Sequence, residues 1–306
     1  MKAFSKNLLL LLASGLLLLL SACQSKSSGE DGEKPGTGTL TVLTFNIRFD
    51  NPGDSLNAWP NRRPRVDAFL DSVAPDLIGL QEVLHSQLQE LLAAHPAYEG
   101  YGVGREDGLE KGEYQPLLWR KERFEAADKG HFWLSETPDT PSKGWDAACE
   151  RTAVWALLRD KVSGREYLVM NTHLDHMGET ARIESARMLK SRALRLAEGR
   201  PIILTGDFNA GPDSSVIALI KASEGSDRPF IDSRDSALRT DDNLWTYHDF
   251  GRYPLDQRER IDYIFLSGFS GDEIVSQTIF DEEESDPAHV YLSDHYPVLL
   301  ELNPAK

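Results

Sequence analysis

Hydrophobic runs of strand length alternate with helical apolar spacing along the chain from about residue 40 onward. Runs rich in β-branched and aromatic residues predict strands over residues 40–47, 77–82, 151–158, 167–175, 201–207, 259–266 and 296–300. Apolar positions at helical spacing predict helices over residues 62–73, 85–95, 179–198 and 214–222. Because the strands are mixed with helices, we predict two sheets with helices on their outer faces.

Turn signals connect some of these elements. Ser163-Gly164 predicts a turn that pairs the two strands on either side of it, and Gly199 is a plausible stop for the helix before it. Residues 132–150 are expected to form a long loop that begins at Phe132. Residues 224–254 are expected to be loop-rich.

The N-terminal segment differs from the rest. Lys2 and Lys6 precede an apolar run from Leu8 to Leu20, which indicates a signal peptide over residues 1–22. Leu20-Ser21-Ala22-Cys23 resembles the lipobox of bacterial lipoproteins, which implies that Cys23 becomes acylated; the alternative is an ordinary signal peptide with a chance cysteine. Residues 23–39 have almost no apolar side chains and predict a flexible tether, so we expect the folded domain at residues 40–306.

Composition narrows the function. The 306 residues are 40% hydrophobic and 27% charged, as expected for one large globular domain. The net charge is -16, and removal of the signal peptide takes away two further lysines. A chain of this charge lacks the broad basic surface of a nonspecific nucleic-acid binder, whereas clustered carboxylates suit a hard divalent cation. In the mature chain Cys149 would be the one free thiol, so no intramolecular disulfide is expected.

The most informative stretch is Leu204-Thr205-Gly206-Asp207-Phe208-Asn209. Side chains alternate along a strand, so Asp207 and Asn209 share one face and Phe208 takes the other. A carboxylate and an amide would then lie together at the C-terminal end of a strand, where ligands bind in layered α/β proteins. Taken alone, the pair would more simply cap a turn.

Other strand ends carry polar residues too. They are Asn46, Glu82, Asn171 with His173, and Asp294 with His295, while Asp262 lies inside the 259–266 run. Each has a simpler explanation by itself, such as a turn residue, a helix N-terminal charge or a hydrogen-bonded core histidine. Their joint occurrence favours a site, because buried polar groups need partners or a metal.

Each residue type suits a step of phosphoryl chemistry. Glu82 and Asp294 offer hard oxygens for Mg²⁺. Asp207 could accept a proton from an attacking water, which Asn209 could orient. His173 and His295 could donate to a phosphate, and Asp262 could select the tautomer of a histidine.

These motifs also occur in a familiar order. The motifs are Thr44-Phe45-Asn46-Ile47, Leu80-Gln81-Glu82, Asn171-Thr172-His173-Leu174, Gly206-Asp207-Phe208-Asn209, Arg260-Ile261-Asp262-Tyr263-Ile264 and Ser293-Asp294-His295-Tyr296-Pro297-Val298. The ordered set, spanning residues 40–302, resembles the endonuclease/exonuclease/phosphatase (deoxyribonuclease-I-like) superfamily. The resemblance implies a four-layer α/β/β/α sandwich, an α/β (α+β) fold with two central mixed sheets flanked by helices and a site at one end.

The resemblance also implies roles. Glu82 would be the principal metal ligand, with Asn46 and Asp294 nearby. Catalysis and phosphate contact would fall to His173, Asp207, Asn209, Asp262 and His295, with Asp262 supporting His295. The identity of the general base and the number of metals, one or two, stay open.

Further residues are expected to bind the substrate or its phosphate. Arg151 resembles a phosphate-contacting arginine on an inner strand, and Asn171 belongs to the His173 motif. Trp145 is expected to shape the substrate entrance together with Trp133 and Trp245, or else to close small satellite cores. Asp175 and His176 are either a supporting pair or a solvated loop.

The branch of the superfamily is less defined. Gly206-Asp207-Phe208-Asn209-Ala210-Gly211-Pro212 resembles the deadenylase-like branch, while segments 132–138 and 144–151 resemble secreted bacterial members. The tract typical of inositol polyphosphate 5-phosphatases is missing, as is the apolar hairpin of secreted sphingomyelinases.

Together these features predict a hydrolase of phosphoesters that uses Mg²⁺ or Mn²⁺, as a phosphodiesterase, nuclease or phosphatase. Its substrate would be a nucleic acid, a nucleotide, a phospholipid or a sugar phosphate. We expect a monomer outside the cytoplasm, held by its lipid anchor on the bacterial cell envelope, at the periplasmic or surface face of the outer membrane. The alternatives are a sphingomyelinase-like phosphodiesterase and a non-catalytic surface binding lipoprotein.

Overall fold

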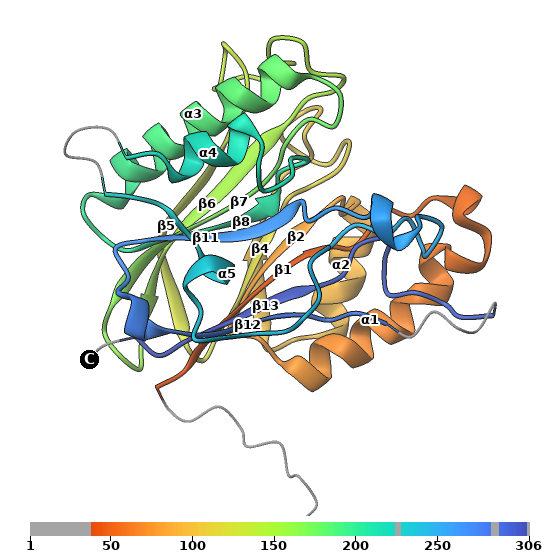
Figure 1. The fold of residues 1–306 in the computed structure, drawn as a ribbon, viewed down its shortest axis with the longest axis horizontal. Helices are drawn as coiled ribbons and strands as arrows, with labels where there is room; N and C mark the ends of the chain where they lie inside the picture. The colour runs from red at the N-terminus through yellow and green to blue at the C-terminus, as the bar shows by residue number, and fades with distance from the viewer. Residues whose placement is uncertain (1–37, 224–227, 283–287, 305–306) are drawn as a thin grey trace, which may run out of the picture. The chain divides into compact units, whose positions relative to one another are not determined.

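Two β-sheets form the centre of the protein in a computed structural model that describes residues 38–223, 228–282 and 288–304 (Figure 1). The seven-stranded sheet has the order β10-β12-β13-β1-β2-β4-β3, and the six-stranded sheet has the order β5-β6-β7-β8-β11-β9. The strands are β1 Leu40–Asn46, β2 Leu77–Gln81, β3 Tyr98–Tyr101, β4 Leu117–Arg120, β5 Phe124–Trp133, β6 Thr152–Asp160, β7 Glu166–His173, β8 Ile202–Asp207, β9 Ile231–Asp232, β10 Arg239–Thr240, β11 Asp262–Ser267, β12 Ile274–Ile279 and β13 Val298–Leu302. The predicted signal peptide, Cys23 and the tether as far as residue 37 lie outside the described residues.

The central strands are buried on both faces, and alternation divides their side chains between two cores. In β1, Val42 packs in the core between the sheets, whereas Leu43 and Phe45 pack in the core on the outer side. In β8, Ile203 faces the inter-sheet core while Ile202 and Leu204 face outward. Because each face of these strands packs against a core, both sets of alternating side chains are apolar. The sequence of these strands is therefore nearly continuously apolar.

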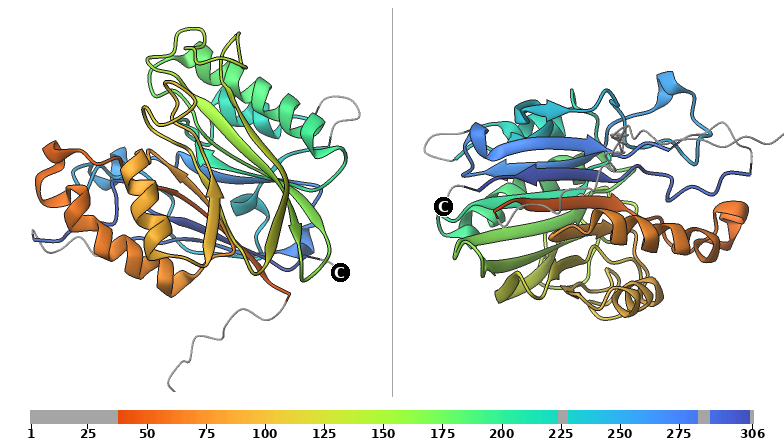
Figure 2. Two further views of the ribbon diagram at one scale, coloured as in Figure 1. Left: turned by 180° about the vertical axis from the view of Figure 1, so that it is seen from behind. Right: turned by 90° about the horizontal axis from the view of Figure 1, so that it is seen from below.

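Helices cover the outer face of each sheet (Figure 2). Helices α1 (Trp59–Val73) and α2 (His85–Ala94) pack on the seven-stranded sheet through residues that include Val66, Leu70 and Leu91. Helices α3 (Glu179–Ala197) and α4 (Ser215–Lys221) pack on the six-stranded sheet. The short helical elements are α5 Ser233–Ser236, η1 Pro52–Asn57, η2 Leu255–Gln257 and η3 Gly271–Glu273. The predicted α/β/β/α sandwich with two central mixed sheets is confirmed.

The predicted element ends agree with the structure where local signals are strong. Helix α3 ends at Ala197, Glu198 and Gly199 follow with φ of 47° and 90°, and α4 begins after the Ser214 N-cap. Helix α1 begins at Trp59, three residues before the predicted start. Six strands lie outside the predicted strand runs: β3, β4, β5, β9, β10 and β12. Strand β5 lies at a sheet edge with largely exposed polar residues, so its sequence carries little apolar alternation.

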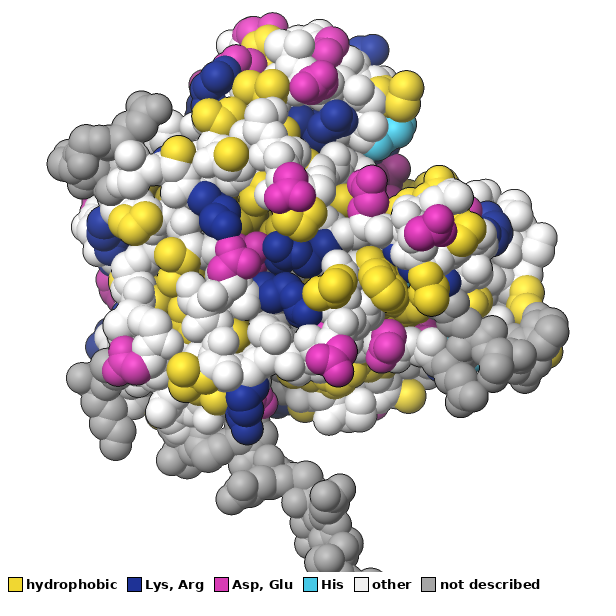
Figure 3. All heavy atoms as spheres, in the orientation of Figure 1, with side chains coloured by type: hydrophobic (Ala, Val, Ile, Leu, Met, Phe, Trp, Pro, Cys, Tyr) yellow, Lys and Arg dark blue, Asp and Glu magenta, His cyan; other side chains and the backbone are white. Residues whose placement is uncertain are grey.

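The protein surface carries side chains of both charges (Figure 3), as expected from a sequence with 33 basic and 49 acidic residues. Acidic and basic side chains are interspersed over the face shown in Figure 3, with hydrophobic patches between them. Among the helices of the described residues, none is both long and apolar enough to cross a membrane.

Candidate active site

The polar strand ends meet at one end of the sandwich. The register pairs Asn46 with Gln81 in one sheet, and pairs Asp207 with both His173 and Asp262 in the other. Asn46 lies four residues after Val42, and Asp207 lies four residues after Ile203. Each therefore shares a strand face with a residue of the core between the sheets, and both side chains point between the sheets. Asp262 is the first residue of β11 rather than an interior residue, which places it at this end as well.

The backbone at this end is unusual. Glu82 directly follows β2, and Asn209 lies two residues after the end of β8; their φ values of 58° and 46° are left-handed. Arg48, two residues after β1, has a φ of 58°. Such conformations are uncommon for residues with a side chain and often occur at functional sites. At β8 the turn leaves Phe208 packed edge-on against Tyr263 in the outer core, while Asn209 returns to the side of Asp207. The predicted division of faces is therefore confirmed.

Asn46 joins the two sheets at the centre of the site. Its Nδ2 lies 3.0 Å from Glu82 Oε1 and 3.0 Å from Asp207 Oδ2. The same nitrogen lies 3.4 Å from His295 Nε2. A single amide thus contacts an acid from β2, an acid from β8 and the histidine that precedes β13.

His295 and Asp262 form the pair that the sequence predicts. Their Nδ1 and Oδ2 atoms are 2.8 Å apart, and His295 Nε2 lies 3.8 Å from Asp207 Oδ2. Burial would lower the pKa of His295, but the charges of Asp262, Asp207 and Asp294 outweigh it and raise that pKa to about 10. The imidazole is therefore held as a cation that can donate from Nε2 toward the site.

His173 is in the opposite electrostatic state. Its Nε2 lies 3.0 Å from Asn209 Nδ2 and 3.4 Å from Asp207 Oδ2. Burial, together with the positive charges of Arg151 and Arg105, lowers the pKa of His173 well below its usual value. This site therefore combines a neutral and a cationic histidine on either side of one carboxylate.

That carboxylate, Asp207, is itself perturbed. Burial raises its pKa to about 7, and the neighbouring charge of Asp262 acts in the same direction. Its Oδ1 accepts a hydrogen bond from the backbone N–H of Asn209 at 2.9 Å, which fixes the side chain. A carboxylate with a pKa near neutrality suits general base catalysis.

Four acidic side chains lie close together in this site. Glu82 and Asp294 lie near Arg48, and Asp207 and Asp262 lie near His295. In addition, Asp262 Oδ1 is buried and has no hydrogen-bond partner among the described residues. Burial of unpaired carboxylates is costly, so this set of hard oxygens fits a divalent cation.

The predicted metal ligands occupy neighbouring positions. Asn46 bonds Glu82, and Asp294 Oδ2 lies 3.7 Å from Arg48 Nε, while Arg48 Nη1 lies 3.7 Å from Glu82 Oε2. Arg48 also binds Asp54 at 3.1 Å. A second set, formed by Asp207, Asp262 and His295, brings its ligating atoms within 4.8 Å of one another. The structure supports a metal at this end of the sandwich, and the ligand roles stay predictions.

Asn171 requires a correction. Asn171 is on the same face of β7 as His173 but two residues further from the end of the strand. Its side chain there is fully buried between the sheets. Its Nδ2 donates to Leu80 O at 2.7 Å, and its Oδ1 accepts from Gln81 Nε2 at 2.7 Å. Its Oδ1 also accepts from Thr205 Oγ1 of the neighbouring strand at 3.0 Å. Both ends of the amide are therefore used inside the protein, largely to join the two sheets, so the predicted substrate contact is wrong.

Replacement of Asn171 by alanine therefore tests a structural role. The change leaves the carbonyls of Leu80 and Pro116 and the amide of Gln81 without their buried partner. We expect Asn171→Ala to lower the free energy of unfolding by roughly 3 kcal/mol, since each unsatisfied buried group costs about 1–3 kcal/mol. Urea unfolding measures this loss. Unchanged stability combined with a raised substrate KM would instead restore the substrate role.

The tryptophans divide between core and loop. Trp133 is 4% exposed and its indole N–H donates to Arg105 O at 2.7 Å, and Trp245 packs against the inter-sheet core. Trp133 therefore agrees with the predicted alternative of closing a core, and a role of the partly buried Trp245 at the entrance stays a prediction. Trp145 is half-buried on the 144–150 loop with a φ of 49°, and its substrate role stays a prediction.

Arg151 lies beside this loop and next to His173. Its Nε contacts Asp175 Oδ2 at 3.4 Å, and its Nη2 contacts His176 Nδ1 at 3.0 Å. Asp175 and His176 therefore support Arg151, as one of the two predicted alternatives states. Burial would raise the pKa of Asp175, but backbone N–H groups, including that of Gly178, and Arg151 lower it to about 2.

Three residues of this region were not predicted from the sequence. Arg48 follows Asn46 by two positions, so strand alternation could have suggested it. Tyr247, whose ring lies 4.9 Å from that of His295, and Arg105 come from loops. No local pattern indicates that those loop residues reach the site.

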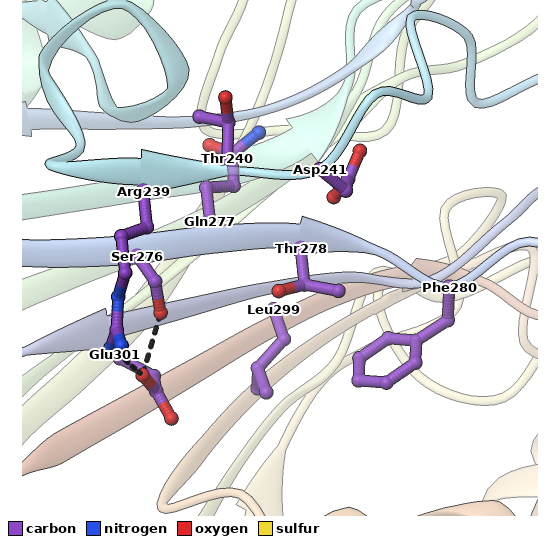
Figure 4. A pocket seen from close by; sticks show the side chains of 9 residues that line it. All are labelled: Arg239, Thr240, Asp241, Ser276, Gln277, Thr278, Phe280, Leu299 and Glu301. Carbon is purple, nitrogen blue, oxygen red and sulfur yellow. Dashed lines mark hydrogen bonds and ion pairs between the residues drawn. The ribbon is translucent and has the colours of Figure 1, made fainter.

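A surface hollow of about 480 Å³ lies elsewhere, over β10, β12 and β13 (Figure 4). Its lining contains none of the predicted site residues. Polar groups there pair with one another, with Glu301 Oε2 at 2.6 Å from Ser276 Oγ and 3.8 Å from Arg239 Nη2. The hollow therefore offers no comparable chemistry.

Comparison with known proteins gives consistent similarities. The model of the Endonuclease/Exonuclease/phosphatase family matches residues 43–295. The crystal structure of an endonuclease/exonuclease/phosphatase from Bacteroides vulgatus is 41% identical, with a TM-score of 0.80 over 86% of this chain and 98% of that chain. The structure of a mannosyl-6-phosphatase from Bacteroides thetaiotaomicron is 34% identical, with a TM-score of 0.77 over 86% and 99% of the two chains.

A more distant relative is nocturnin of Drosophila melanogaster. It is 27% identical over 192 residues, which cover 59% of this chain but only 28% of nocturnin. This similarity accompanies the motif resemblance to the deadenylase-like branch, while the two bacterial structures share more identity with this chain.

Proposed function

The chain belongs to the endonuclease/exonuclease/phosphatase family, whose members hydrolyse phosphoester bonds, and from that premise we propose that it is a divalent-metal-dependent phosphoester hydrolase acting outside the cytoplasm. One observation carries the proposal. Asp207, with a pKa raised to about 7, lies between the neutral His173 and the cationic His295 in a site rich in buried carboxylates. A non-catalytic binding protein would not need this arrangement.

The chain's own residues divide the chemistry between them. Glu82, Asn46 and Asp294 would hold the cation, which supplies stabilisation of negative charge on phosphoryl oxygens when bound. Asp207 takes the proton of the attacking water, and Asn209 orients that water. His295, with Asp262 fixing its tautomer at 2.8 Å, donates from Nε2 to the charge that develops in the transition state.

The substrate is best sought first among small phosphate esters. The similarity to a mannosyl-6-phosphatase, at 34% identity over nearly the whole of that chain, supports sugar phosphates as the first class to test. Nucleotides, single-stranded nucleic acid and phospholipids complete the panel. Phosphate or alcohol release is measured with Mg²⁺, with Mn²⁺ and with EDTA. The proposal expects hydrolysis of at least one class that EDTA abolishes, and metal-independent or absent hydrolysis would contradict it.

We also propose that the protein is attached to the cell envelope through acylated Cys23, on the basis of Leu20-Ser21-Ala22-Cys23. The wild-type protein should partition into the detergent phase of a Triton X-114 extraction, and Cys23→Ser should move it to the aqueous phase. Wild-type protein in the aqueous phase would exclude the anchor.

A further inference from the structure

Two arginines, Arg151 and Arg105, have charges that act on His173, and each has a buried nitrogen without a partner among the described residues. Arg151 is 4% exposed and is held by Asp175 and His176 through two of its three guanidinium nitrogens. Its third nitrogen, Nη1, is buried and has no hydrogen-bond partner among the described residues. A buried N–H without a partner in the protein requires an explanation, and a bound anion is one.

Arg105 presents a similar arrangement from the 102–115 segment. Its Nη1 binds Glu113 Oε2 at 2.7 Å, while its Nε is buried and has no partner among the described residues. Its backbone is held by Trp133 Nε1 at the carbonyl and by Glu113 O at the N–H, 2.7 and 3.1 Å away. The position of Arg105 is therefore set by packing and not by exposed loop geometry.

Residues 113–115 contact Arg105, the residue after Glu82 and the residue after Arg151. Tyr114 forms a β-bridge with Val83, the residue after Glu82. One position along, Gln115 Oε1 accepts from Thr152 Oγ1 at 2.5 Å, and Thr152 follows Arg151. Glu113, which binds Arg105, is thus placed between the Glu82 side of the site and Arg151.

The electrostatic effects agree with this placement. The charges of Arg151 and Arg105 both act to lower the pKa of His173, and both also act on Cys149. Burial raises the pKa of Glu113, and the charge of Glu82 acts in the same direction. The positive charges of both arginines therefore act on the histidine that is expected to contact the phosphate.

From this geometry we infer that Arg105 and Arg151 bind the terminal oxygens of a phosphomonoester, so that the site prefers monoesters to diesters. The inference rests on the proposed function and specifies its substrate class. A monoester dianion carries a third unesterified oxygen and a second charge, which a diester lacks. Guanidinium groups with free N–H donors are suited to that oxygen, because hydrogen bonds between charged groups are the strong ones.

A matched pair of substrates tests the inference. The substrates are a hexose 6-phosphate and its methyl diester, with release of free hexose measured for wild-type protein, Arg105→Met and Arg151→Met in Mg²⁺. We expect the wild type to prefer the monoester. Each variant should lose about 10- to 100-fold in kcat/KM on the monoester and less than about 3-fold on the diester. Arg187→Met, at an exposed position of α3, is the control and should change neither value.

Two kinetic results would overturn the inference: a wild-type preference for the diester, and equal losses on both substrates. If a methionine variant does not fold, Arg105→Lys or Arg151→Lys replaces it, because lysine keeps the positive charge. The lysine variants should also lose kcat/KM on the monoester more than on the diester, but by a smaller factor. Calorimetric titration with inorganic phosphate in Mg²⁺ is independent of turnover. The variants should bind phosphate at least about tenfold more weakly than wild type, and unchanged affinity would overturn the inference.

The titration also separates the two proposals. If wild-type protein hydrolyses no phosphoester, the proposed function fails. In that case, weaker phosphate binding by the arginine variants still supports the anion site, and unchanged binding refutes it.

Discussion

Asp207→Asn and His295→Ala are each expected to lower kcat by at least about 100-fold with little change in KM. The carboxylate of Asp207 contacts both Asn46 and His173, and its raised pKa of about 7 suits proton transfer from water. General acid–base assistance is typically worth about 10²–10⁴-fold, and a donor to the transition state about 10²–10³-fold. Steady-state kinetics on the best substrate of the panel measures both losses.

The two residues are expected to act in one step. Their side chains lie 3.8 Å apart at Asp207 Oδ2 and His295 Nε2, so loss of one removes the function of the other. The double variant should therefore lose far less than the product of the single losses. Full multiplicativity would contradict a shared step, and near-normal kcat in the single variants would contradict the catalytic roles. Asp213→Asn, at an exposed position just after the Asp207 turn, is the matched control.

The second large effect is expected for Glu82→Gln. The amide keeps the shape of the side chain and one acceptor for Asn46, but it removes a negative charge from the proposed metal site. We expect Mg²⁺ affinity to fall at least about 10- to 100-fold, the range seen when even the outer partners of a metal site are changed. Activity should fall with it and recover in part at high Mg²⁺.

Isothermal calorimetry with Mg²⁺ measures the affinity, and a thermal melt verifies the fold. Glu122→Gln, at an exposed turn position, controls for the loss of one charge from an acidic protein. Equal Mg²⁺ affinities of wild-type protein and Glu82→Gln would exclude Glu82 as the principal ligand. In that case the set of Asp207, Asp262 and His295 would become the stronger candidate.

The local chemistry of the chain was predictable from sequence because it depends on near neighbours. Apolar runs of strand length marked the central buried strands, and the polar residues that end them marked the site. Asn46, His173 and Asp207 point between the sheets by alternation alone, and the register then brings them to one end. The ordered motifs were sufficient to predict the four-layer fold.

Alternation along a strand does not determine how deeply a side chain is buried or which distant residues it contacts. The tertiary structure decides both. Asn171 and His173 share a strand face, yet two residues of depth make one a buried link between sheets and the other a site residue. Trp133 lies in a core because β5, an edge strand with little apolar pattern, carries it inward. Arg105 is held by Glu113, and the two residues after Glu113 contact Val83 and Thr152, far away in the sequence. Sequence periodicity reports which way a side chain points from its own strand, whereas its neighbours across the sandwich depend on how the whole chain packs.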